Sequence, residues 1–78
     1  MTGFPNRKTV ERLREQFKPG VTVELIKMDD PFAPPVGTRG KCLGVDDAGS
    51  VMVAWSNGSG LSVAYGEDLC KVVKDNDR

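Results

Sequence analysis

Residues 51–65 have the sequence VMVAWSNGSGLSVAY and decide the fold, because they describe two short strands joined by a turn. Apolar side chains alternate with small or polar ones on both sides of Asn57-Gly58, a dipeptide that strongly indicates a hairpin. A loop of odd length gathers the large side chains on one face, whereas a two-residue loop would scatter them. We therefore predict an odd loop with a glycine bulge. The expected pairs are Trp55–Leu61, Val53–Val63 and Val51–Tyr65.

Further strands flank this hairpin on both sides. Alternating apolar side chains predict strands over residues 21–26 and 39–45, and a short last strand over residues 70–73. Residues 46–49 supply the turn of a second hairpin, and three prolines make residues 28–37 a long loop. Five short strands in so small a chain favour a closed barrel, which leaves no sheet edge exposed.

Before the first strand, the chain has the periodicity of a helix. Val10, Leu13 and Phe17 form one apolar stripe, which must pack against another element. Asn6 caps the start of this helix, and the Lys-Pro-Gly sequence after Phe17 ends it. The predicted boundaries are 1–20 for the helix and its linker, 21–74 for the barrel and 75–78 for a polar tail.

A set of residues spread over positions 19–73 carries a resemblance to known families. They are Pro19-Gly20, Met28-Asp29-Asp30-Pro31, Pro35, Gly37-Thr38-Arg39-Gly40, Val45-Asp46-Asp47, Val53, Trp55, Asn57-Gly58, Leu61 and Tyr65-Gly66. The pattern resembles a domain-of-unknown-function family of small proteins from bacteria, phages and mobile elements. The order of elements is similar to that of SH3-like barrels, and more distantly to Mind-bomb-type and KOW-type modules. The resemblance implies a mainly β fold, with an N-terminal α-helix followed by a five-stranded SH3-like barrel, and brings no established chemistry.

The composition describes one small domain and argues against catalysis. The chain has 78 residues, 11 basic and 11 acidic side chains, and no histidine, the commonest general base and metal ligand. We therefore expect a protein that is not an enzyme and binds no metal or cofactor. No apolar run approaches the roughly 18 residues of a membrane-spanning helix, so we expect no membrane contact. We also expect a cytoplasmic protein that is a monomer or a weak dimer. Cys42 and Cys70 are expected to be reduced, buried thiols.

The long loop after the first strand is the first candidate binding surface. Phe32 lies between prolines, so it either folds back over the barrel or is presented to a partner. The predicted binding residues are Asp29, Asp30, Phe32, Arg39 and Tyr65. The two aspartates also suit a simple turn, and the glycines around Arg39 suit a tight corner as well as a phosphate.

Basic side chains supply the second candidate surface. Residues 1–20 carry five basic and two acidic side chains, whereas the rest of the chain carries six basic and nine acidic ones. A basic helix can contact phosphate, although such charges most often form a solvated face. The predicted phosphate-contacting residues are Arg7, Arg14, Lys18, Arg39 and Lys41.

The sequence therefore predicts a non-catalytic binding module. A protein partner in a phage or mobile-element context is favoured, through the long loop. The alternative is binding of nucleic acid or a nucleotide phosphate through Arg39, Lys41 and the basic helix, which includes capture by a phage of a host defence factor or signal.

Overall fold

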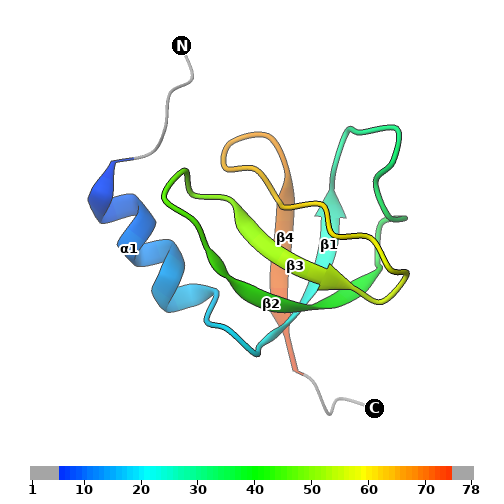
Figure 1. Cartoon of the computed structure of the whole chain (residues 1–78), viewed down its shortest axis with the longest axis horizontal. Coiled ribbons are helices and arrows are strands. Elements are labelled where there is room, and N and C mark those ends of the chain that lie inside the picture. The colour runs from blue at the N-terminus through cyan, green and yellow to red at the C-terminus, as the bar shows by residue number, and fades with distance from the viewer. Residues whose placement is uncertain (1–5, 75–78) are drawn as a thin grey trace.

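The computed structural model describes residues 6–74 as one helix and one antiparallel sheet (Figure 1). Residues 1–5 and the predicted polar tail at 75–78 lie outside this description. The elements are α1 (Arg7–Gln16), β1 (Thr22–Lys27), β2 (Arg39–Val45), β3 (Val51–Trp55) and β4 (Leu69–Val73). The order of strands in the sheet is β3-β2-β1-β4, and each neighbouring pair is antiparallel.

Helix α1 begins and ends where its sequence predicts. The Asn6 side chain accepts a hydrogen bond from the Thr9 N–H at 2.8 Å, as an N-cap residue does. At the other end, the Phe17 N–H donates to the Leu13 carbonyl at 2.7 Å. Val10 and Phe17 are buried, so the apolar stripe of the helix faces the sheet.

Four of the five predicted strands form, and the fifth does not. Strands β1 to β4 begin and end within one residue of the predicted positions. Residues 61–65, predicted as a strand, contribute only an isolated bridge between Val51 and Val63. The prediction of a five-stranded closed barrel is therefore corrected, because within residues 6–74 the sheet is four-stranded and open. The sheet curls, so that β3 crosses in front of β4 in Figure 1.

Side-chain hydrogen bonds account for the missing strand. The Trp55 indole N–H donates to the Leu61 carbonyl at 2.8 Å, and the Leu61 N–H donates to the Ser59 hydroxyl at 3.3 Å. The Ser59 N–H in turn donates to the Asn57 side chain at 3.0 Å. These bonds occupy backbone groups of residues 59–61 that a fifth strand would have paired with β3.

The hairpin register is shifted by two residues from the predicted one. Val51 pairs with Val63 rather than with Tyr65, and the Trp55 N–H donates to the Ser59 carbonyl at 3.0 Å. The loop is nevertheless odd, and its glycine has a φ of 91°, the left-handed conformation predicted for the bulge. A shift of two residues preserves the alternation of faces, so Val51, Trp55 and Val63 all remain buried.

The core lies between α1 and the inner face of the sheet. Its buried members are Val10, Phe17, Val23, Leu25, Cys42, Val45, Val51, Val53, Trp55 and Val63. Only Val10 and Phe17 come from the helix, and the others come from the sheet and the bridging segment. The helix therefore covers a face that the strands alone would leave exposed to water.

Polar contacts fix the position of α1 against β2. Arg14 Nε donates to the Val45 carbonyl at 3.0 Å, and Arg14 Nη2 bonds to the Asp47 carboxylate at 2.8 Å. The Asp47 side chain is almost fully exposed, so this ion pair orients the helix more than it stabilises it. The buried Cys42 thiol donates to the Phe17 carbonyl at 3.4 Å, which ties the end of α1 to β2.

Strands β2 and β3 approach each other too closely at Gly40 for a side chain to fit. A Cβ atom there would lie 2.7 Å from the Ala54 carbonyl oxygen and 2.7 Å from a methyl group of Val53. Gly37, at the end of the preceding loop, has a φ of 95°, which favours glycine. The two glycines around Arg39 thus shape the corner between the loop and β2, as the simpler interpretation of this motif predicts.

We expect Gly40→Ala to lower the free energy of unfolding by about 2 kcal/mol, because the added methyl group forces β3 to move. Gly60→Ala is the matched control, since a Cβ at Gly60 meets no atom within 4 Å. Urea unfolding curves of the two variants and the parent measure the difference. Equal stabilities for the two variants would contradict this account of Gly40.

Candidate functional site

The loop between β1 and β2 is held closed at its base by backbone hydrogen bonds. The Leu25 N–H donates to the Thr38 carbonyl at 2.9 Å, and the Gly37 N–H donates to the Leu25 carbonyl at 2.9 Å. The Thr38 N–H also donates to the Pro35 carbonyl at 3.0 Å. Pro34 is buried beneath the loop. The loop therefore leaves the sheet and returns to it through fixed contacts.

The tip of this loop is also ordered by hydrogen bonds. The Asp30 side chain accepts from the Phe32 N–H at 2.8 Å, and the Asp30 carbonyl accepts from the Ala33 N–H at 2.9 Å. Asp30 thus makes the Asx turn that its position before a proline indicates. The Asp29 side chain lies beside it and is exposed.

Phe32 is presented to solvent rather than folded back over the sheet. Its side chain is 82% exposed, and Val36 on the same loop is 71% exposed. The alternative in which Phe32 folds back over the sheet is therefore excluded, and its binding role stays a prediction. Val36, near the base of the loop, is a second exposed apolar residue, which the sequence analysis did not single out.

Arg39 and Lys41 lie on the outer face of the sheet. Arg39 Nε bonds to the Glu24 carboxylate at 3.1 Å, and Lys41 Nζ donates to the Thr22 hydroxyl at 3.5 Å. Both basic residues alternate along β2 with Cys42, whose side chain points to the core on the opposite face.

The predicted phosphate-contacting residues do not form one surface. Arg39 and Lys41 lie on the outer face of the sheet, whereas Arg7 and Arg14 are on α1, whose Val10 packs into the core on the inner face. Arg7 and Arg14 line one shallow depression with Asp47, and Arg14 is already bonded to Val45 and Asp47. Lys18 is exposed just beyond the end of the helix.

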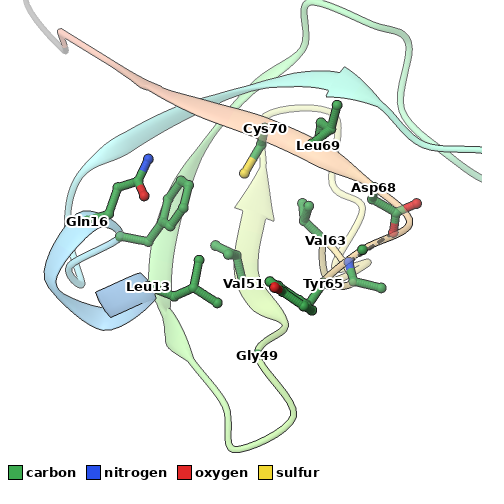
Figure 2. Close-up of a pocket in the computed structure, with 12 residues that line it drawn as sticks. Leu13, Gln16, Gly49, Val51, Val63, Tyr65, Asp68, Leu69 and Cys70 are labelled. Carbon is green, nitrogen blue, oxygen red and sulfur yellow. Dashed lines mark hydrogen bonds between the residues drawn. The ribbon is translucent and has the colours of Figure 1, made fainter. Parts of the chain in front are cut away.

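Tyr65 lies away from the loop, in an apolar groove between α1 and the start of β4. The groove has a volume of about 390 Å³ and contains no residue of the loop that carries Phe32. In Figure 2, Leu13 and Gln16 form one wall, Val63 and Tyr65 form another, and the Cys70 thiol points into the space between them. The predicted binding residues therefore fall into two separate places, with Tyr65 alone in the groove.

The sequence did not identify this groove. Its walls include Leu13, Val63 and Leu69, which the pattern assigned to the core or to no site at all. One signal was available, because residues 69–73 have the sequence LCKVV, with apolar side chains at both inward and outward positions. A strand with only one buried face needs apolar side chains on that face alone. The additional apolar residue Leu69 is 56% exposed.

The two cysteines are free thiols, as predicted, but only Cys42 is buried, whereas Cys70 is partly exposed. Both thiols resist ionisation. Burial raises the pKa of the Cys70 thiol to about 11, and the neighbouring Cys42 thiol adds to the increase. Burial also raises the pKa of Cys42. Both thiols are therefore protonated at neutral pH, which makes them poor nucleophiles and leaves the groove wall at Cys70 uncharged.

No group of three or more metal-ligating side chains occurs within residues 6–74. In the same part of the chain, no helix has the length and apolarity needed to cross a membrane.

We expect the Cys70 thiolate to form only near pH 11 in the folded protein, and near pH 9 in the unfolded chain. Because the folded state holds this proton more tightly, its contribution to stability is present below pH 9 and is lost as the pH rises toward 11. Ultraviolet thiolate absorbance of the parent minus that of Cys70→Ala follows the titration. A midpoint near pH 9 in the native protein would show that Cys70 is not buried in this way.

Comparison with known proteins places this chain in a family. Neither a curated protein nor a solved structure gives a significant match. A family model described as "Domain of unknown function (DUF4314)" matches residues 6–73, which include α1 and all four strands. The chain belongs to the DUF4314 family.

Proposed function

We propose that this domain is a non-catalytic protein-binding module that presents Phe32 to its partner. One observation carries the proposal: Phe32 is 82% exposed at the tip of a loop whose base and tip are both hydrogen-bonded. An exposed aromatic side chain on an ordered loop loses little conformational freedom when it binds. Its burial in a partner's pocket contributes roughly 2 to 3 kcal/mol.

The surroundings of Phe32 indicate what kind of pocket it fits. Val36 is a second exposed apolar side chain of the same loop, and Asp29 and Asp30 are exposed carboxylates that precede Phe32 in the tip. A complementary pocket is apolar at its centre and basic at its rim, because such charges steer association and exclude partners of the wrong sign. The loop thus supports a protein partner better than a polyanion.

The groove does not suggest catalysis. Among its lining residues, Tyr65, Asp68 and Cys70 are titratable. The Asp68 carboxylate accepts a hydrogen bond from the Ala64 N–H at 2.9 Å, which holds the turn before β4, and the Cys70 thiol is protonated. These groups do not form the nucleophile and base pair that acid–base catalysis needs.

A distant relationship to SH3-like barrels is part of the proposal. The strand order β3-β2-β1-β4 and the long connection from β1 to β2 support it. So does the single turn before β4, in which the Glu67 and Asp68 N–H groups donate to the Ala64 carbonyl at 3.2 and 3.0 Å. The phage or mobile-element context comes from the resemblance alone. A cytoplasmic location is supported by the two free thiols, which suit a reducing compartment.

Phosphate binding by the outer face of the sheet is the second candidate function. The register places Arg39, Lys71 and Lys41 on this face, with Glu24 between the first two. This arrangement can contact a phosphate backbone without the helix. Because Arg39 is already bonded to Glu24, we consider this function second to protein binding.

A photo-crosslinking amino acid in place of Phe32 is expected to form a covalent product with one defined protein in cells that carry this chain. The same group in place of Leu43, which is 58% exposed on β2, is the matched control. With the purified partner, Phe32→Ala should weaken binding at least about tenfold, as loss of an aromatic anchor does. Equal products at the two positions, or unchanged affinity of Phe32→Ala, would refute the proposed role of the loop.

An NMR titration of the labelled protein with single- and double-stranded oligonucleotides separates the two functions. We expect no amide shifts at Arg39, Lys41 or Lys71 at about 200 mM salt, and at most weak shifts at about 50 mM. Specific shifts of these amides that persist at the higher salt concentration would make phosphate binding the primary function.

A further inference from the structure

Strand β4 is one edge of the sheet, and among residues 6–74 no strand pairs with its outer side. The Leu25 N–H donates to the Thr38 carbonyl and the Cys42 N–H donates to the Val21 carbonyl, so odd-numbered residues of β1 bond to β2. Even-numbered residues of β1 therefore bond to β4, where their partners are Lys71 and Val73.

The same alternation directs the backbone groups of every second residue of β4 away from β1. The N–H and carbonyl groups of Cys70 and Val72 must point to the free edge of β4, because neighbouring residues of a strand bond to opposite sides. The order β3-β2-β1-β4 gives no strand on that side within residues 6–74. These two residues therefore offer a template for one more strand.

On the outer face, a row of charges of alternating sign ends at this edge. Arg39 on β2 lies opposite Glu24 on β1, which lies opposite Lys71 on β4. The Glu24 carboxylate is bonded to Arg39 at 3.1 Å, and no ion pair of Lys71 occurs within residues 6–74. An acidic side chain on an added strand would continue the row and pair with Lys71.

On the inner face, the same edge opens into the apolar groove. Val72 is 41% exposed although it faces inward, and Cys70, on the same face, lines the groove. Figure 2 shows β4 along one side of this space and Gln16 of α1 on the other. Apolar side chains on either side of the acidic residue would lie next to Cys70 and Val72. The one next to Cys70 would reach the groove, and the one next to Val72 would cover its exposed side chain.

We propose that β4 binds an extended peptide segment of a partner as an additional strand, with an apolar–acidic–apolar sequence opposite residues 70–72. The backbone groups of Cys70 and Val72 supply the hydrogen bonds, and Lys71 selects the acidic residue. The groove accepts the apolar side chain next to Cys70, and the exposed Val72 side chain packs against the other. This surface is separate from the Phe32 loop, so the two proposals stand or fall independently.

A second copy of this chain does not fit the same edge. In antiparallel pairing of two β4 strands with fullest overlap, Cys70 lies opposite Val72 and Lys71 lies opposite Lys71. Two ammonium groups directly opposite each other are destabilising, and lysine at a sheet edge opposes such self-pairing. The charge on this edge therefore favours an acidic partner of a different sequence.

Selection from a displayed library of short random peptides, with the purified full-length chain as bait, tests the proposal. We expect enriched peptides to share an apolar–acidic–apolar core and to shift the amide resonances of Cys70 and Val72. Lys71→Glu should weaken their binding at least fivefold, and selection against this variant should enrich a basic residue at the central position. Lys8→Glu, at an exposed position of α1, changes the net charge equally and should leave binding unchanged.

Two further variants complete the test. Val72→Pro removes an N–H that faces the free edge and not β1, so it should abolish binding, with urea unfolding to confirm that the variant folds. Phe32→Ala should bind the peptides as the parent does. The proposal is overturned if selection yields no binders, or if the binders are unaffected by Lys71→Glu.

Discussion

The packing of α1 against the inner face of β2 is the contact on which the rest of the structure depends. The strands and the bridging segment alone form an open, curled sheet whose apolar inner face would meet water. Val10 and Phe17 cover that face, and Arg14 and Cys42 fix the helix end and angle through bonds to backbone carbonyls. A domain this small is marginally stable, so loss of the helix would expose the core side chains that Val10 and Phe17 cover and would destabilise the fold.

The same contact separates the surfaces available for binding. The basic residues of β2 lie on the outer face, whereas Val10 of α1 and Phe17 at its end pack on the inner face. The helix also forms one wall of the groove beside β4, with Leu13 and Gln16. The loop that carries Phe32 makes its hydrogen bonds to β1 and within itself, so its conformation does not depend on the helix or on the groove. One scaffold thus offers a projecting loop and an open sheet edge.

Local patterns predicted the elements better than their assembly. Helix caps and alternation placed α1 and four strands within a residue, because these signals act over a few positions. The prediction of a fifth strand was wrong because side chains of Asn57, Ser59 and Trp55 form hydrogen bonds with nearby backbone groups. The alternation of apolar residues gives no information about such hydrogen bonds. Phe32 was identified as a candidate from its flanking prolines. The groove at Tyr65 was not identified, because residues of α1 and β4, which are far apart in the sequence, line it together.

Binding through Phe32 requires the loop over residues 28–37 to be ordered in the free protein while it exposes this side chain. Order parameters from ¹⁵N relaxation measure that order, because they report motion of each backbone amide on the picosecond-to-nanosecond timescale. We predict values close to those of β1 and β2, about 0.85, at Phe32 and Ala33. Values below about 0.6 at these residues would contradict the account, since the loop would then lose much of its freedom on binding.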